Sequence, residues 1–330
     1  MLSRVADTIY WMSRYLERAE NIARFVEVNW HLTLDMPDQD FQQWMPLVNV
    51  TGDYSMFIER YGNATQENVI SFLTFDLNYA NSIHSCLRAA RENARTVREI
   101  IPSEMWEQIN TFYHLIADAA KHPDPVLSNP YDLCEQVKFR GLLLGGIYTD
   151  TMTHDEGWHF FRLGRLLERA DKTSRILDVK YFIILPRIKD VGTTYDQIQW
   201  AALLRTTSAF QAYRRIYGRI TPLHVTEFLL LDHDFPRSVL HCLVNAQQSL
   251  HAISGNPVGG FKNLAEKRLG HLCAELSYTR SEEILQKGLH QFIDGLQMEM
   301  NEVNMAIFET FSCNVSDSQC GIFNQAQVQA

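Results

Sequence analysis

The chain has 330 residues, of which 46% are hydrophobic, enough for one large domain or two smaller ones with a buried core. Its 30 basic side chains are outnumbered by 39 acidic ones, which gives a formal net charge of −9. Proteins that coat nucleic acids usually carry a basic excess, so this balance argues against a bulk-polyanion binder, although a local arginine cluster can still hold one anionic ligand.

The beginning of the chain, "MLSRVADTIYWMSRYLERAE", lacks the apolar core of a secretory signal peptide. No apolar run approaches the roughly 18 residues that are needed to cross a bilayer. The six cysteines form no CxxC pair, so neither a zinc ribbon nor a redox motif is indicated. We therefore expect a cytoplasmic protein with reduced thiols.

The predicted elements are helices throughout. Apolar residues recur every three or four positions from Ile9 to Trp30 and again from Phe160 to Tyr181, which is the spacing of one helix face. The pattern returns further along the chain, and no hairpin signal lies between apolar runs. Helical stretches of this kind cover residues 71–101, 103–121, 199–218, 238–253 and 282–311. Residues 312–330 are polar and aperiodic, which predicts a flexible tail.

Two segments of the chain nearly repeat each other: "SRYLERAENIARFVEV" near the N-terminus and "GRLLERADKTSRILDV" in the middle. Glu168 stands 151 residues after Glu17, and further pairs have the same offset. After a connection that follows Trp30, the offset becomes 156, as for Cys86 and Cys242. The repetition predicts a helical bundle formed by internal duplication of a roughly 150-residue unit, with pseudo-two-fold symmetry and repeats at about 1–150 and 151–311.

Charged residues flank the apolar stripe of each repeated helix. With 100° per residue, Glu17, Glu20 and Arg24 lie beside the stripe of the first helix, where they are expected to be partly buried. The corresponding residues of the second helix are Glu168, Asp171 and Arg175. Four further arginines complete the candidate set, and the first two of them fall opposite the stripe: Arg14, Arg18, Arg165 and Arg169.

Three interpretations of these charges remain open. Glu20–Arg24 and Asp171–Arg175 are i,i+4 pairs, worth about 0.2–0.5 kcal/mol each, and their repetition can simply record common descent. Alternatively, the two helices pack together and the charges join the two halves of the molecule. In the third interpretation the same cluster holds a ligand or performs acid–base chemistry, because buried carboxylates beside arginines have shifted pKa values.

Other motifs point to no catalytic chemistry of their own. The histidines of "HDEGWH" are five residues apart, whereas a zinc-binding HExxH motif needs four, so His154, Asp155 and Glu156 are expected to cap or extend the second repeated helix. There is no phosphate-binding loop and no GxSxG motif. Cys86 and Cys242 have apolar neighbours, which is typical of core residues. We expect neither a metal nor a cofactor.

The start of the chain, "LSRVADTIYWMSRYLERAENIAR", and the stretches "QWAALLRTTSAFQAYRRIYG" and "FLLLDHDFPRSVLHCL" resemble the bacterial alpha-E domain proteins. The resemblance extends from Met1 to about Phe311 and implies a single alpha-E domain over residues 1–311. It also implies two partners, a circularly permuted ATP-grasp protein and a transglutaminase-like protein, in a system that synthesises or modifies peptides. The family's repeated glutamate corresponds here to Glu17 and Glu168.

Two functions follow as hypotheses. In the first, the chain is an accessory or scaffold protein that binds a peptide or the ATP-grasp partner, which carries out the ligation. In the second, the chain is itself an enzyme of amide-bond modification, with Glu17 or Glu168 as acid or base and the neighbouring arginines binding a carboxylate. Whether the chain is an enzyme stays open from the sequence alone.

Overall fold

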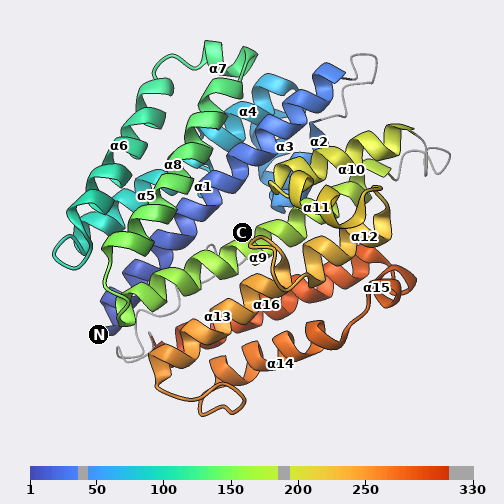
Figure 1. Ribbon diagram of the computed structural model, residues 1–330. Helices are drawn as coiled ribbons and strands as arrows, with labels where there is room; N and C mark the ends of the chain where they lie inside the picture. The colour runs from blue at the N-terminus through green and yellow to red at the C-terminus, as the bar shows by residue number, and fades with distance from the viewer. Residues whose placement is uncertain (36–43, 185–193, 312–330) are drawn as a thin grey trace.

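Helices make up most of the computed structural model, which describes residues 1–35, 44–184 and 194–311 (Figure 1). The predicted all-α class is confirmed, since the described residues contain no strand. The first half comprises α1 (Ser3–Asp35), α2 (Met45–Thr51), α3 (Tyr54–Tyr61), α4 (Gln66–Thr74), α5 (Ile83–Thr96), α6 (Ser103–Ala119), α7 (Asp124–Ser128) and α8 (Tyr131–Thr151). The second half comprises α9 (Glu156–Ile184), α10 (Thr194–Thr206), α11 (Phe210–Tyr217), α12 (Pro222–Thr226), a π-helical turn η2 (Glu227–Leu231), α13 (Val239–Ser254), α14 (Leu264–Tyr278), α15 (Ser281–Lys287) and α16 (Leu289–Phe311).

The long helices form two groups of four. In the first group α1 contacts α5 and α8, and α6 closes the group by packing on both of these. In the second group α9 contacts α13 and α16, and α14 packs on both. Figure 1 shows the two groups side by side, with α1 of the first group and α9 of the second lying against each other at the centre of the molecule. The predicted packing of the two repeated helices is therefore confirmed.

Small residues let α1 and α9 approach closely. A Cβ atom added to Gly164 would lie 2.5 Å from the carbonyl oxygen of Tyr10 and would also meet the hydroxyl of Ser13. No real side chain tolerates such contact with backbone, so the crossing depends on glycine at this position of α9. Ser13 is itself buried, and its hydroxyl donates a hydrogen bond to the carbonyl of Tyr10. The charged side chains that follow on both helices are thereby brought within reach of each other.

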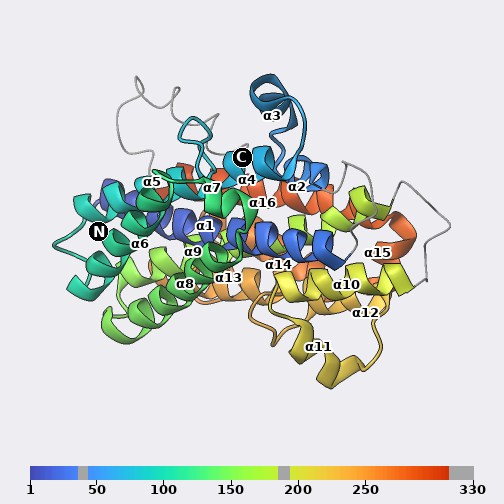
Figure 2. The ribbon, with the colours of Figure 1, turned by 90° about the horizontal axis from the view of Figure 1, so that it is seen from above.

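The short helices extend this arrangement. α2 packs on α9 of the other half, and α10 packs on α1. Figure 2 shows α3 and α11 projecting on opposite sides of the molecule. Each half also begins its second large helix with the same cap, because the hydroxyl of Ser82 accepts from the backbone N–H of Ser85 in α5 and that of Ser238 accepts from His241 in α13.

Three of the predicted helical stretches are interrupted. Residues 71–101 divide into α4 and α5, residues 199–218 divide at Ser208, and residues 282–311 divide at Gly288. The backbone at Ser208 and Gly288 has positive φ, which an α-helix cannot continue through. The expected cap of the second repeated helix is confirmed, since Asp155 accepts from the backbone N–H groups of Gly157 and Trp158.

Among the described helices, none combines the length and the apolar character that crossing a membrane requires. Two sequence-based predictions lie outside the described residues. These are the flexible tail at 312–330 and most of the connection in which the repeat offset changes.

Candidate functional site

Glu168 of α9 is surrounded by three cations. Arg14 Nε donates to Glu168 Oε2 at 2.8 Å, and Arg18 binds both carboxylate oxygens, with Nε at 2.7 Å from Oε1 and Nη2 at 3.1 Å from Oε2. The ammonium group of Lys172 lies 3.5 Å from Oε1. The Glu168 side chain is wholly excluded from solvent. Two charge-assisted bonds from one guanidinium fix the carboxylate in position as well as stabilise it.

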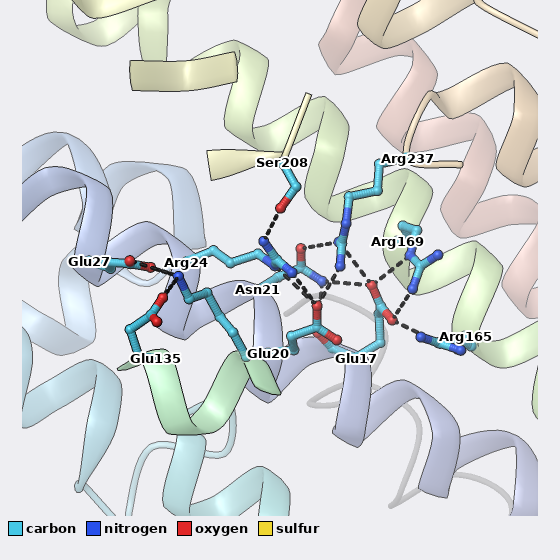
Figure 3. A network of polar contacts seen from close by, with 11 residues as sticks. Glu17, Glu20, Asn21, Arg24, Glu27, Glu135, Arg165, Arg169, Ser208 and Arg237 are labelled. Carbon is cyan, nitrogen blue, oxygen red and sulfur yellow. Dashed lines mark hydrogen bonds and ion pairs between the residues drawn. The ribbon is translucent and has the colours of Figure 1, made fainter. Parts of the chain in front are cut away.

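Glu17 of α1 has the matching set of partners, shown in Figure 3. Arg169 binds both carboxylate oxygens at 2.8 Å, and Arg165 Nε donates to Oε2 at 3.0 Å. The third cation is Arg237, whose Nη1 donates to Oε1 at 3.3 Å. Each helix therefore supplies one glutamate and two arginines to the other, and each glutamate receives a third cation.

The other two acids extend the cluster along the helices. Arg24 donates to Glu20 through Nε at 3.1 Å and Nη2 at 2.7 Å, and Arg237 contacts the same Glu20 oxygen. Arg175 Nε lies 3.0 Å from Asp171 Oδ2. The two predicted i,i+4 pairs are thus present, each within one of two sets of ion pairs, one around Glu17 and one around Glu168, which are together called the ionic cluster here. Its members are Glu17, Glu20, Glu168, Asp171, Arg14, Arg18, Arg24, Arg165, Arg169, Lys172, Arg175 and Arg237.

All ten candidate residues from the sequence belong to this cluster, but the expected orientation of Arg14 and Arg18 is wrong. The helical wheel placed both opposite the core, whereas the structure buries them to 6% and 2% exposure. The wheel assumes one buried face, and α1 is instead contacted by α5, α8, α9 and α10 around its circumference. A helix enclosed in this way buries its charges together with its apolar residues.

Two cations of the cluster were missed by the sequence analysis. Lys172 stands 151 residues after Asn21, which donates to Glu17, and Arg237 stands 156 residues after Asn81, which accepts from Arg18. Each missed cation therefore lies where the other half has an asparagine in contact with the same cluster. The offset of the repeat is the signal that would have found them.

The cations keep the buried carboxyl groups ionised. Burial alone would raise the pKa of Glu17, but Arg169 and Arg237 hold it well below the ordinary value. Burial acts in the same direction on Glu168, where Arg18 and Lys172 outweigh it and hold the pKa well below the ordinary value. Asp171 behaves likewise, since burial is outweighed by Arg175 and Lys172 and its pKa is lowered to about 2. A general acid or base works best with a pKa near the ambient pH, which these groups do not have.

The inner cluster is enclosed. Beside Glu17 and Glu20 the free space is about 10 Å³, room for roughly one water molecule. α8 covers this side through two glycines, since a Cβ on Gly141 would meet the Glu20 carboxylate and one on Gly145 would lie 2.8 Å from Arg165 Nη2. A substrate therefore has no room beside Glu17 in this arrangement.

Acid should weaken the fold through these carboxyl groups. A carboxyl group whose pKa is lower in the folded than in the unfolded chain stabilises the fold above its unfolded pKa, and this contribution disappears as the pH falls through the folded value. For Asp171 that window runs from about pH 4 down to about pH 2. We expect the urea midpoint to fall steeply below pH 4 with little change between pH 6 and 8. A urea midpoint that did not change with pH down to pH 3 would contradict the claim that the buried carboxyl groups of the cluster are ionised in the folded protein.

Two groups of side chains could supply metal ligands. Asp178, His290 and Asp294 have ligand atoms within 4.8 Å of one another, as do His271, Glu275 and Glu299. In the first group His290 already lies 2.8 Å from Asp178 and 3.4 Å from Asp294, so an ion would have to displace those contacts. The expectation that no metal is bound stays a prediction. Cys86 and Cys242 lie in the core, where burial raises each thiol pKa to about 12.

A larger, polar cavity lies at the end of the cluster. It has a volume of about 480 Å³ and is bounded by α1, α8, α10 and the turn that follows α10. Arg24, at the outer end of the ionic cluster, is part of its wall. The other polar lining residues include Glu27, Tyr131, Lys138, Arg205 and Ser208.

The fold and the site together define a class of protein: an all-helical chain in which two four-helix groups are joined through a buried ionic cluster on two central helices. The chain belongs to the alpha-E family, whose model, described as a predicted alpha-helical domain with a conserved ER motif, matches residues 1–311. Glu17-Arg18 and Glu168-Arg169 have this Glu-Arg order and form the centre of the cluster. A third such pair, Glu59-Arg60, lies in α3 outside it.

Curated relatives come from mycobacteria. An uncharacterised protein of Mycobacterium bovis and one of Mycobacterium tuberculosis are each 24% identical to the chain over 321 residues, which is 91% of the chain. The matched region is 34% of each relative, so the chain spans about a third of their length. No solved structure matches the chain.

Proposed function

We propose that the chain is a helical binding protein of a cytoplasmic peptide-modification system, in which it holds a peptide for a circularly permuted ATP-grasp protein that acts together with a transglutaminase-like protein. The partners are those implied by the alpha-E resemblance. One observation favours binding over catalysis: Glu17 and Glu168 are 2% and 0% exposed, and each carboxylate forms ion pairs with three cations.

The catalytic alternative requires a proton donor or acceptor that a substrate can reach. Neither glutamate meets this requirement, because space beside Glu17 is limited to about 10 Å³ and both pKa values are held well below the ordinary range. The same contacts are those of a structural ion-pair network that holds α1 and α9 together. The role proposed for the cluster is therefore to join the two halves and position the surfaces around it.

Co-purification tests the proposed partnership. The tagged chain and a circularly permuted ATP-grasp protein of the same organism are co-expressed, and the complex is examined by native mass spectrometry at micromolar concentration. We expect a defined complex, and no change in peptide mass when either protein is incubated with ATP and the peptides alone. Absence of any complex at micromolar concentration would contradict the proposal.

Glutamate variants separate the structural from the catalytic role. Glu17→Gln and Glu168→Gln should lower stability, yet the fraction that remains folded should support peptide modification by the complete system as well as the original chain does. Glu302→Gln, in an exposed ion pair with Arg268, serves as the matched control. If folded Glu17→Gln or Glu168→Gln protein were inactive, the cluster would be catalytic and the binding role would fail.

We further infer that the two halves arose by duplication of one helical unit and are related by pseudo-two-fold symmetry. The reciprocal glutamate–arginine contacts support this, as do structural features that recur at an offset of 156. Thr65 and Thr221 cap α4 and α12, and Gly62 and Gly218 both have positive φ. A unit that arose in this way explains why each half needs the other: each supplies the cations that neutralise its counterpart's glutamate.

A further inference from the structure

The cavity of about 480 Å³ at the outer end of the ionic cluster has the size of a small-molecule site. Two other cavities in the described part of the chain have about 30 and 10 Å³ and offer no comparable room. Its wall combines residues of α1, α8 and α10 with Ser208, so that it is assembled only in the folded molecule.

The charge of the wall favours an anion. Three cations, Arg24, Lys138 and Arg205, face one carboxylate, that of Glu27. Lys138 is already engaged, since its ammonium group lies 2.6 Å from Glu27 and also contacts Glu135. Arg205 is exposed and has no ion-pair partner among the described residues, and the ring of Phe210 lies against its guanidinium group.

Arg24 connects the cavity to the cluster behind it. Three of its N–H groups are used by Glu20 and Ser208, and a guanidinium group has five. The cluster itself contains eight cations and four carboxylates, so it carries an excess of positive charge. In a chain with a net charge of −9, the field of this excess attracts an anion to the 480 Å³ cavity, whose wall includes Arg24 of the cluster.

Ser208 holds Arg24 at the cavity from a strained backbone position. The N–H of Ala209 bonds to the carbonyl of Leu204 and the N–H of Ser208 to that of Arg205, which is a Schellman motif at the end of α10. The residue in this position is usually glycine, yet Ser208 has φ +54, and it is the one non-glycine residue with positive φ in the described chain. Its hydroxyl accepts a hydrogen bond from Arg24 Nη1 at 2.6 Å.

The other half of the molecule supplies a contrast. Gly52, which stands 156 residues before Ser208, occupies the same left-handed position at the end of α2, with φ +80. The arginine nearest to it is Arg175, the counterpart of Arg24, and Arg175 Nη1 bonds to the carbonyl of Val50. Only the second half thus replaces glycine by a residue that can bind the arginine, and backbone strain of this kind collects at binding sites.

We propose that this cavity binds an oxyanion, the carboxylate or phosphate group of a small ligand or peptide end. Arg24 and Arg205 bind its oxygens, and Ser208 is a positioning residue that fixes the Arg24 guanidinium. This deepens the proposed function, because it gives the binding protein a ligand site. Anion binding can be tested independently of the proposed partnership, since the experiment needs only the purified chain.

Calorimetric titration of the purified chain distinguishes the two sources of the oxyanion. The probes are N-acetylglutamate, inorganic phosphate and N-acetylglutaminamide, in which both carboxylates are replaced by neutral amides. We expect saturable binding of N-acetylglutamate or of phosphate at pH 7 that weakens as sodium chloride is raised. Binding of one anion alone identifies the source, and N-acetylglutaminamide should bind more weakly than N-acetylglutamate. If neither anion bound at millimolar concentration, the proposal would be overturned.

Variants locate the bound anion. Arg205→Gln should weaken binding about tenfold, because it removes a charge-assisted contact. Arg215→Gln is the matched control, since Arg215 is likewise exposed, lies on the neighbouring α11 and does not line the cavity. Equal loss of affinity in both variants would show a general charge effect and overturn the proposal.

Ser208→Gly separates positioning from stability. Glycine relieves the left-handed backbone, so the melting temperature should stay the same or rise, while the loss of the hydroxyl should weaken anion binding several-fold. Ser208→Ala, which keeps the strain but lacks the hydroxyl, should weaken binding by a similar factor. If both variants bound the anion as the original chain does, Ser208 would have no part in the site and the proposal would fail.

Discussion

Glu168→Gln is expected to lower the free energy of unfolding by about 3–5 kcal/mol, because it leaves buried cations without their counter-charge. Glutamine has nearly the same size and shape, so packing changes little. Arg14, Arg18 and Lys172 would remain around a neutral side chain that is shielded from solvent. Urea unfolding at pH 7, followed by circular dichroism and by tryptophan fluorescence, measures the change and shows whether the transition is two-state.

The matched control is the same substitution in an exposed ion pair. Glu302→Gln breaks the contact with Arg268, whose side chain is 41% exposed, and should cost less than about 1 kcal/mol. A loss for Glu168→Gln that falls within about 1 kcal/mol of this control would show that the cluster contributes little to stability. Glu17→Gln should resemble Glu168→Gln, since its carboxylate has the reciprocal set of partners.

Gly164→Ala should destabilise the protein by about 1–3 kcal/mol through overpacking where α1 and α9 cross. In an unconstrained helix the same change stabilises by roughly 0.8–1.0 kcal/mol, so any loss reports the contact between the helices. The added Cβ would lie 2.5 Å from the backbone carbonyl oxygen of Tyr10, which cannot move without shifting α1. The melting temperature and the urea midpoint both measure the effect.

Gly146→Ala provides the control for this prediction. Gly146 lies inside α8, is exposed, and has no atom within 4 Å of the position of an added Cβ. Alanine should therefore stabilise the protein by about 0.5–1 kcal/mol. If Gly164→Ala were as stabilising as Gly146→Ala, α1 and α9 would not be in the close contact described here.

The arrangement at the centre of the molecule was predictable because the chain repeats it. The two LERA segments share an offset of 151, and matching helices with acids and arginines beside the apolar stripe are expected to pack together. The pairing of particular residues was not predictable, since it depends on the crossing point at Gly164. The wheel also failed for Arg14 and Arg18, because periodicity within one helix does not report how many helices surround it.

The interruptions of the long helical stretches depend on details that apolar periodicity does not record. Asp76 accepts from the backbone N–H of Asn78 and from Arg60 and Tyr61, so its side chain stabilises the turn between α4 and α5. Apolar residues continue through this turn, and the pattern alone therefore reads as one helix. The end of α10 before Ser208 is likewise not visible in the sequence pattern, because serine carries no sequence signal for a left-handed backbone.

The cavity beside Arg24 was beyond prediction for a different reason. Its wall is drawn from α1, α8, α10 and Ser208, which are distant in sequence, and no spacing within one element reports that they meet. The sequence did single out Arg24 as a candidate binding residue. The structure shows that this arginine is the one place where the buried cluster contacts the 480 Å³ cavity.

A double-mutant cycle between Arg18 and Glu168 tests most directly whether the two central helices are held together by mutual neutralisation of their charges. Arg18→Met, Glu168→Gln and the double variant are unfolded with urea at pH 7. We predict that the double variant is more stable than the sum of the two single losses implies, by at least about 1 kcal/mol, because each single change leaves the other group buried and unpaired. If the stability loss of the double variant equalled the sum of the two single losses to within about 0.5 kcal/mol, the account would be contradicted.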